Sequence, residues 1–359
     1  MKLLSIFIFL SLRVYRISLK LSHKIKWKRK TKRLIRLKGS KKLTNDQKQD
    51  IKAFYDSFNL RYISSFWHQF YYSCNGQFSA EYVPEDLFYV EIEPNLNRTV
   101  FVDVLADKNL LATLFPEVAQ PETIFKNING FYYCNDELVA EEYVQKLCET
   151  DFEMVIKPTL DTGGGKNVVV FKCSSGLTNW RSYSLIKLLK GYKKDYIVQK
   201  LVEQHSKMKV LNSTSLNTFR VMSYLTEDKV DILSIIVRMG KEGSRTDNST
   251  GGGLSCGVNP DGTLKRVGYN NNTGNSFTET EAGIKFEDIK LPFMEQINRT
   301  VIDLHKRVPY FRLISWDLAI DPEGKVILIE YNIKGQDINF HQLNNGPVLK
   351  ELLTNHDFR

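Results

Sequence analysis

The chain has 359 residues, of which 42% are hydrophobic and 25% are charged, and this composition is that of an ordinary folded protein with room for more than one domain. It contains no run of about 20 apolar residues, which excludes a membrane-spanning helix of normal length. Five scattered cysteines without a CxxC pair exclude a disulfide framework and a zinc ribbon, and they predict a reducing, cytosolic setting.

The positive charge is concentrated at one end of the chain. Residues 1–42 contain fifteen Lys and Arg and no Asp or Glu, whereas the rest of the chain has 35 basic and 41 acidic side chains. The net charge of +9 is therefore the sum of a tail of +15 and a body of −6.

The tail begins with an apolar run over residues 3–12, which has the length of a signal-peptide core. Only Lys2 precedes the run, no small-x-small cleavage site follows it, and fourteen basic residues come next, so we expect the chain to stay in the cytoplasm. Three interpretations remain: binding to an anionic membrane surface, binding to nucleic acid, and a solvated, partly disordered tail. The apolar residues favour a peripheral position on the inner face of the cell membrane, and we expect no nucleic-acid partner.

The first part of the body is predicted to mix helices and strands. Thr44-Asn45 followed by Gln47 indicates a helix start, and residues 46–59 continue as a helix. Aromatic side chains crowd residues 54–72, where helical spacing favours core packing over a sugar-stacking platform. Residues 87–93 and 99–104 are predicted to be strands, and Asp107 opens a short helix that ends at Leu114.

Strands dominate from Met154 onward. No strand or helix is assigned within the Gly- and Asn-rich stretch 243–275, and the chain closes with a hairpin whose turn is at 321–324. The predicted strands are 154–157, 167–172, 196–200, 218–225, 230–238, 314–320 and 325–331, and the predicted helices are 181–190 and 294–307.

The closing hairpin carries a candidate metal site. Strand pairing around the turn brings Asp317 close to Glu330, which shares a face with Asn332 and Leu328. Two carboxylates at this distance repel each other unless a cation lies between them, and hard oxygen ligands suit Mg²⁺ bound together with substrate phosphates. The alternative is an exposed hairpin, which the apolar flanking residues disfavour.

Two further segments have features of phosphate binding. Lys157 stands inside a strand that leads into a glycine-rich loop, Gly163 to Lys166, where backbone N–H groups can approach phosphate oxygens. Asn167 follows where a Walker A motif needs Ser or Thr, so the loop is not a P-loop. By itself such a loop is equally consistent with a flexible turn.

Two arginines lie on strands that pair across a hairpin, Arg220 after Asn217 and Arg238 opposite, and they indicate an anionic ligand. Upstream, residues 196–203 can present backbone groups to an adenine edge, with Glu203 available to ribose hydroxyls. A second glycine loop, residues 247–253, allows close approach of the backbone to a ligand.

The order of these segments resembles the ATP-grasp superfamily, and within it the sugar-transfer associated ATP-grasp proteins, over roughly residues 85–345. The resemblance implies an α+β ATP-grasp fold in which two α+β lobes sandwich ATP, preceded by an N-terminal α/β region and the basic tail. It divides the chain into residues 1–42, 43–150, 151–206 (nucleotide lobe), 207–345 (metal-binding lobe) and 346–359.

The same resemblance assigns roles to individual residues. It implies that Lys108 and Lys157 bind the phosphates of ATP. Arg220 and Arg238, together with Lys157, would stabilise the charge of the transition state. One or two Mg²⁺ ions would be bound by Asp317, Glu330 and Asn332. Ser315 stands where D-alanine–D-alanine ligases have an arginine, so the oxyanion role must fall to Arg220 or Arg238. The remaining implied contacts are Gly163, Gly164, Gly165, Lys166, Gln199, Lys200, Leu201, Val202, Glu203 and Asn217 for ATP, and Asn248, Gly252 and Gly253 for the acceptor.

The implied activity is ATP-dependent ligation of a carboxylate to an amine through an acyl phosphate, applied to a sugar acid or to a capsular or exopolysaccharide precursor. The alternative is an ATP-grasp kinase acting on a sugar hydroxyl. The resemblance further implies sugar-linked or small-molecule carboxylate and amine substrates, and glycosyltransferases of the same pathway as partners.

Overall fold

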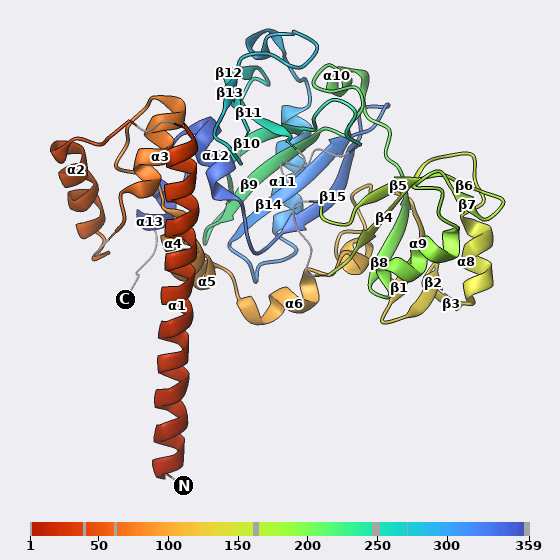
Figure 1. Ribbon diagram of the computed structural model, residues 1–359, viewed down its shortest axis with the longest axis horizontal. Helices are drawn as coiled ribbons and strands as arrows, with labels where there is room; N and C mark the ends of the chain where they lie inside the picture. The colour runs from red at the N-terminus through yellow and green to blue at the C-terminus, as the bar shows by residue number, and fades with distance from the viewer. Residues whose placement is uncertain are drawn as a thin grey trace. The chain divides into compact units, whose positions relative to one another are not determined.

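The computed structural model describes residues 2–38, 41–60, 63–160, 165–245, 252–270 and 272–354 (Figure 1). The chain forms two compact units. Unit 1 contains residues 1–97, 269–276 and 337–359, and unit 2 contains residues 98–268 and 277–336.

Unit 1 is helical. Its second helix starts as the sequence predicts, since Thr44 Oγ1 accepts from the Gln47 backbone N–H at 3.2 Å while Gln47 Oε1 accepts from the Thr44 N–H at 3.0 Å. No helix among the described residues is both long and apolar enough to cross a membrane. The helices are α1 (Lys2–Lys38), α2 (Asn45–Asp56), α3 (Phe66–Asn75), α4 (Glu85–Leu87), η1 (Phe88–Ile92), α5 (Glu93–Leu96), α12 (Ile338–Asn345) and α13 (Lys350–Thr354).

The aromatic residues of this unit form its core, as their helical spacing predicts. Tyr55, Trp67, Phe70 and Tyr71 are fully buried, and Tyr71 stacks on Tyr82 with ring centroids 4.5 Å apart. These faces are therefore occupied by protein and are not a platform for a sugar ring.

The strands predicted at 87–93 and 99–104 are wrong. The first segment is helical through α4, η1 and α5, and the second forms η2 (Thr99–Phe101) and α6 (Val102–Leu105). In the first segment the buried residues Leu87, Phe88 and Ile92 lie at helical spacing and pack in unit 1, where α4 and η1 contact α1. Packing against a helix thus overrides the strand preference of these β-branched and aromatic residues.

The smaller sheet of unit 2 has the strand order β3-β2-β1-β8-β4-β5, and its neighbouring strands pair antiparallel. Helices α8 (Glu141–Leu147) and α9 (Leu185–Tyr192) contribute buried side chains to its core. The strands are β1 (Thr123–Ile128), β2 (Phe131–Cys134), β3 (Glu137–Val139), β4 (Met154–Pro158), β5 (Val169–Phe171) and β8 (Tyr196–Lys200), and a separate ribbon pairs β6 (Cys173–Ser174) with β7 (Leu177–Thr178).

The larger sheet has the order β13-β12-β11-β10-β9-β14-β15. Two of its strands, β11 and β12, fall in the Gly- and Asn-rich stretch 243–275, where the sequence pattern indicated no strand. Their residues Cys256, Val258 and Leu264 are buried in the core. The strands are β9 (Thr218–Leu225), β10 (Val230–Met239), β11 (Leu254–Val258), β12 (Leu264–Tyr269), β13 (Ser276–Phe277), β14 (Leu313–Ile320) and β15 (Val326–Asn332).

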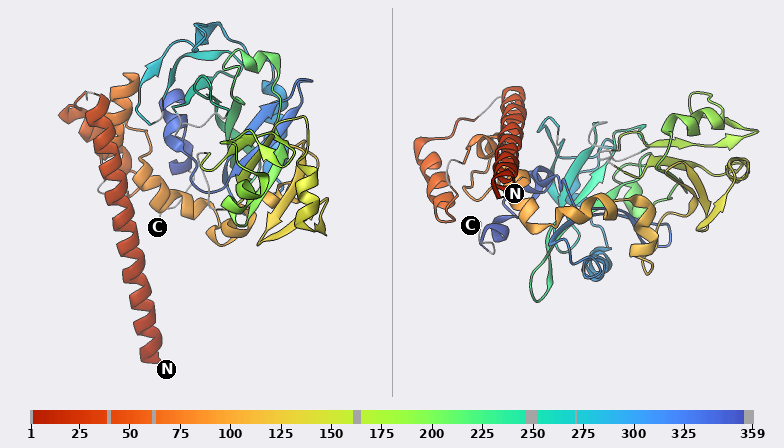
Figure 2. Two further views of the ribbon diagram at one scale, coloured as in Figure 1. Left: turned by 45° about the vertical axis from the view of Figure 1, so that its right-hand side comes forward. Right: turned by 90° about the horizontal axis from the view of Figure 1, so that it is seen from below.

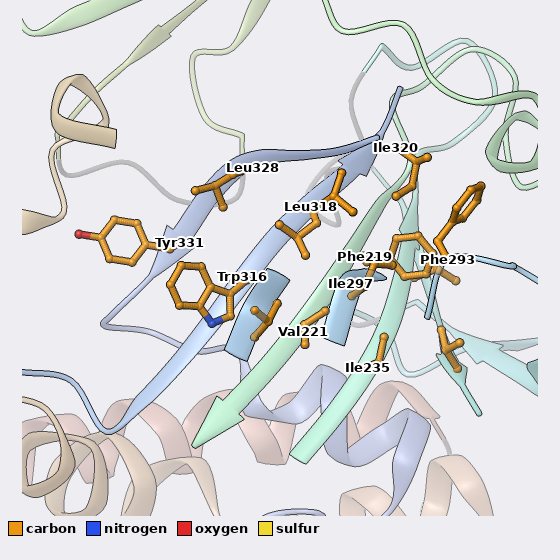
Figure 3. Close-up of a cluster of buried hydrophobic side chains, with 14 of the residues drawn as sticks. Phe219, Val221, Ile235, Phe293, Ile297, Trp316, Leu318, Ile320, Leu328 and Tyr331 are labelled. Carbon is orange, nitrogen blue, oxygen red and sulfur yellow. The ribbon is translucent and has the colours of Figure 1, made fainter. Parts of the chain in front are cut away.

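Helix α11 (Met294–His305) packs against β9, β10, β14 and β15 (Figures 1 and 2). Between them lies the main apolar core, in which Trp316 and Leu318 of β14 meet Phe219 and Val221 of β9 (Figure 3). The remaining short helices are η3 (Lys108–Leu110), α7 (Leu111–Leu114), α10 (Ser206–Lys209) and η5 (Phe286–Asp288).

The strands of this sheet alternate between the apolar core and a charged face. Trp316 and Leu318 point into the core, which places Asp317 on the opposite face. On β15 the register shifts between the pairs Asp317–Glu330 and Leu318–Leu328, so Leu328 lies in the core. The prediction that Leu328 shares a face with Glu330 is therefore wrong, because a β-bulge inserts one extra residue between them.

The core predicts a clear stability difference. Leu318→Ala removes a fully buried side chain and should lower the free energy of unfolding by about 2–5 kcal/mol. Leu138→Ala is the matched control, because Leu138 is 65% exposed on β3 and its truncation should change stability by less than about 0.5 kcal/mol. Urea titration followed by circular dichroism measures both, and equal losses would contradict the assignment of the core.

Candidate functional site

Three charged residues form a row across three neighbouring strands of the larger sheet. Arg220 of β9 is paired with Asp317 of β14, and Asp317 is paired in turn with Glu330 of β15. The sequence-based pairing of Asp317 with Glu330 is confirmed. The row lies on the face of the sheet opposite the apolar core.

The carboxylate of Asp317 is held by two guanidinium groups. Arg220 donates from Nε to Oδ1 at 2.8 Å and from its terminal nitrogen to Oδ2 at 2.7 Å, in the bidentate geometry of a strong ion pair. Arg238 of β10 donates to Oδ2 at 3.3 Å. Burial alone would raise the pKa of Asp317, but the two arginines hold this pKa below its ordinary value of 3.8. The carboxylate is therefore ionised and buried.

Two lysines lie at the other carboxylate of the row. The Nζ atom of Lys108 is 3.2 Å from Glu330 Oε1, and Lys157 of β4 is electrostatically coupled to both residues. Burial is the main cause that lowers the pKa of Lys157 from 10.5 to about 8, Glu330 opposes the change, and the charge of Lys108 adds to it. The smaller sheet and the segment before it thus bring cations to the charged face of the larger sheet.

The site has more positive than negative charge. Four cations, Lys108, Lys157, Arg220 and Arg238, stand against the two carboxylates of Asp317 and Glu330, which gives a formal charge of +2. A cluster of this kind, partly screened from water, attracts anions, and a polyphosphate is the most highly charged of the common biological ones.

The donor set also fits a hard cation. Asp317 and Glu330 supply carboxylate oxygens, and the amide nitrogen of Asn332 donates to the Ser315 carbonyl at 3.2 Å and to Asp317 Oδ2 at 3.5 Å. Three guanidinium hydrogen bonds and the longer one from Asn332 meet the roughly four lone-pair positions of Asp317. A metal bond to this carboxylate would therefore displace one of these donors, of which Asn332 is the most distant. In the described part of the chain no three His, Cys, Asp or Glu side chains are grouped to hold a metal by themselves. This suits Mg²⁺, which takes one or two carboxylates and completes its shell with water and substrate phosphates.

A cavity of about 280 Å³ lies beside the strand that was predicted to be the adenine hinge. Leu201, Val202 and Glu203 line it from one side, directly after β8. Polar residues of the segment 209–216 and Arg245 also line it. Its volume is near the lower limit of about 300 Å³ that is usual for small-molecule sites, so it can hold a base and part of a sugar.

Gln199, Lys200 and Asn217 were also predicted to bind ATP, and they are not among the residues that line this cavity. Lys200 is exposed, with its ammonium 5.0 Å from the Phe152 ring centre, and Gln199 is buried, with its amide nitrogen donating to the Pro121 carbonyl and the Thr123 hydroxyl. Asn217 is fully buried and donates to the backbone carbonyls of Met208 and Asn212, so its side chain holds the segment 208–217 together.

The two glycine loops are only partly described. Gly165 has a φ of +68°, and Lys166 beside it is exposed. Gly252 has a φ of +98°, and Gly253 is buried. Gly163, Gly164 and Asn248 lie outside the described residues.

Two features of the cavity were not found from the sequence. Gln204 is buried, and its side chain binds the carbonyls of Asn212 and Ser215 and the backbone N–H of Asn217, which shapes one wall. Arg245 forms an ion pair with Glu153, and both line the cavity. No sequence pattern marks these residues, because their roles depend on segments 8 to 92 residues away.

The buried ion cluster predicts a large effect of a small substitution. Asp317→Asn leaves Arg220 and Arg238 without a counter-charge and should lower the free energy of unfolding by about 3–5 kcal/mol. Because the folded-state pKa of Asp317 is below 3.8, its stabilisation is complete above the unfolded pKa and is lost as the pH falls through the folded value.

The matched control is Asp231→Asn, whose carboxylate pairs with Lys229 at the surface and should contribute less than about 1 kcal/mol. Thermal unfolding at neutral pH compares the two variants. An Asp317→Asn protein as stable as the control would contradict the view that the arginines depend on this carboxylate.

Several solved structures are similar in fold, at low identity. They include the VanG D-Ala:D-Ser ligase from Enterococcus faecalis (11% identity, TM-score 0.43, 70% of this chain and 60% of that chain covered). The D-alanine-D-alanine ligase from Helicobacter pylori has 13% identity and a TM-score of 0.40, with 71% and 59% covered. The N5-carboxyaminoimidazole ribonucleotide synthetase from Thermotoga maritima has 10% identity and a TM-score of 0.36, with 66% and 43% covered. The match thus spans less than two thirds of each of these chains.

No curated protein matches the sequence. A family model does: the one described as sugar-transfer associated ATP-grasp matches residues 88–357, which include all residues of the charged row, both lysines and the cavity. The chain belongs to the sugar-transfer associated ATP-grasp family.

Proposed function

We propose that this protein is an ATP-dependent ligase that joins a carboxylate to an amine through an acyl phosphate. The observation that carries the proposal is the buried Arg220–Asp317–Arg238 cluster, which lies on the same sheet face as Glu330 and its partner Lys108. Together with Lys157, these residues give a site of net positive charge in a chain that belongs to an ATP-grasp family.

The two ends of the ATP molecule would be bound by different parts of unit 2. The cavity beside Leu201, Val202 and Glu203 has the size for the base, with the carboxylate of Glu203 available to ribose hydroxyls. Lys108 and Lys157 would bind the phosphates as point charges. Their ammonium groups are near Glu330, so the phosphates would lie over the β15 end of the charged row.

The chemistry then consists of two substitutions. A carboxylate oxygen of the first substrate attacks the γ-phosphorus of ATP and ADP leaves, after which the amine attacks the acyl carbon and inorganic phosphate leaves. Negative charge develops on the phosphoryl oxygens in the first step and on the carbonyl oxygen in the second. Arg220 and Arg238 are the fixed donors of the site, and Asp317 keeps them oriented through hydrogen bonds of 2.7–3.3 Å.

Asp317, Glu330 and Asn332 would hold Mg²⁺. When bound, the ion supplies Lewis-acid neutralisation of charge on the phosphate oxygens.

No protein nucleophile is needed, and the one Ser–His pair in the described core is not a candidate. Ser223 Oγ lies 2.7 Å from His305 Nδ1 and accepts a hydrogen bond from the Trp316 indole, while His305 Nε2 bonds to the Phe311 carbonyl. All three side chains are fully buried, and burial lowers the pKa of His305 to about 4. This network satisfies polar groups inside the core and does not serve acyl transfer.

The proposal also extends to the class of substrate, and this part of it is supported by the family description alone. A family associated with sugar transfer favours a carboxylate carried by a sugar acid, so the product would be an amidated uronic acid or a decorated precursor of a capsular or exopolysaccharide. Glycosyltransferases of the same pathway would then be its partners.

The ligase proposal predicts interception of the acyl phosphate. With ATP, Mg²⁺ and a pool of uronic acids, hydroxylamine should yield a hydroxamate with equal amounts of ADP and free phosphate, because hydroxylamine attacks the acyl carbon. Glu330→Gln should lower this turnover by at least about 100-fold, since it removes a charge at the phosphate and metal position. Coupled ADP release and the colour reaction of hydroxamates with iron measure both quantities.

Glu323→Gln is the matched control, because Glu323 is exposed in the turn of the same hairpin and should retain full activity. If phosphate remains attached to the product and no hydroxamate forms, the ligase proposal is wrong and the protein is a kinase. Normal turnover in the Glu330→Gln protein would contradict the assignment of Glu330 to the active site.

The lowered pKa of Lys157 predicts a pH dependence of ATP binding. Only the protonated ammonium attracts phosphate, so affinity should be full below a pH of about 8 and fall as the pH rises through that value, by up to about tenfold per pH unit. Lys157→Arg should remove this dependence because a guanidinium stays charged. Isothermal titration with ADP measures it, with Lys187→Arg at the surface of α9 as the control. A wild-type profile as flat as that of Lys157→Arg would contradict the assignment.

A further inference from the structure

Helix α1 has an exposed apolar stripe. Val14, Ile17, Leu21 and Ile25 follow one another at intervals of three or four residues and are 50–66% exposed. Side chains at this spacing lie on one face of a helix. Exposed single apolar residues are common on protein surfaces, but four in a continuous line indicate a contact surface.

The second half of α1 is attached to unit 1. Trp27 stacks on Tyr89 with ring centroids 4.9 Å apart, Leu34 and Ile35 are buried, and the ammonium of Lys30 lies 3.4 Å from the carboxylate of Glu85. Figures 1 and 2 both show the first half of α1 running clear of α2 and α3. The stripe therefore lies before the attached segment, on the part of the helix that extends outward.

The charge of α1 identifies the partner. The segment 1–42 contains fifteen basic residues and no acidic one. Arg29, Arg33 and Arg36 are exposed beyond the end of the stripe. A second copy of this helix would be repelled by its own charge, and nucleic acid would use the arginines but would gain nothing from the apolar stripe. The surface of an anionic lipid bilayer has an apolar interior directly below charged headgroups. Such a surface matches both the apolar stripe and the basic residues of α1.

We propose that α1 binds the surface of an anionic lipid bilayer, with the stripe in the interfacial region and the exposed arginines and lysines on lipid phosphates. Interfacial helices bind through buried apolar area together with attraction to anionic lipid. The helix lies on the membrane in this proposal and does not span it, in agreement with the absence of a spanning helix among the described residues. The proposal does not rest on the ligase activity.

Sedimentation of the full chain with lipid vesicles tests this inference. The protein should bind vesicles of equal parts phosphatidylcholine and phosphatidylglycerol and not vesicles of phosphatidylcholine alone, and high salt should release it because the charges are screened. The variant with Val14, Ile17, Leu21 and Ile25 all changed to Gln keeps the charge and should lose at least about tenfold in partition.

A second variant separates charge from apolar contact. Changing Arg29, Arg33 and Arg36 to Gln should lower partition by roughly 100-fold, or about fivefold for each charge near the surface. The control changes Val100, Leu138 and Leu177 to Gln, which removes exposed apolar residues (59–77% exposed) outside α1 and should leave vesicle binding unchanged. Circular dichroism confirms that each variant is folded.

Several results would overturn the proposal. Equal binding to both vesicle types, or to neither, decides against it with the unmodified chain alone. A dimer in light scattering that the stripe variant abolishes would assign the stripe to a second copy. Tight binding to a DNA duplex that the stripe variant retains, without vesicle binding, would assign the charge to nucleic acid.

Discussion

The ion cluster at Asp317 is the constraint on which the larger sheet depends. Every residue of β14 is buried, and a carboxylate in such a strand is tolerated only when it is paired and hydrogen-bonded. Its partners come from β9 and β10, so the charge of one strand is neutralised by residues 79 and 97 positions away in the sequence. The order β10-β9-β14 is the arrangement that brings these groups together.

The same strands carry both the apolar core and the charged row because their side chains alternate between the two faces of the sheet. One face of the sheet packs Trp316, Leu318 and Phe219 against α11 and forms the main core. The other face presents Arg220, Asp317 and Glu330 in a row. The rigid core thus fixes the spacing of the charged groups, which is what electrostatic catalysis requires of its donors. The bulge near Ile329 contributes, since it lets Leu328 return to the core while Glu330 stays opposite Asp317.

The two proposals concern different units of the chain. The residues of the proposed ligase site lie in unit 2, and the helix that we propose to bind a membrane surface belongs to unit 1. Each therefore has its own chemistry: a site of excess positive charge for a nucleotide in one, and an apolar stripe followed by arginines for a lipid surface in the other. Neither proposal needs the other to hold.

The sequence alone determined the features that depend on nearby residues or on strong local patterns. The capping box at Thr44 and Gln47 and the hairpin that pairs Asp317 with Glu330 both follow from residues close together in the chain. Only the tertiary structure decided the helical state of residues 87–96, the strands β11 and β12, and the wall of the cavity built by Gln204. The helical state and the two strands depend on packing partners from other segments, and the wall depends on hydrogen bonds of Gln204 that no local pattern marks, although their partners are only 8 to 13 residues away. A local preference of a few tenths of a kcal/mol per residue is easily outweighed by burial of a whole side chain, which is worth about 1.5–3 kcal/mol.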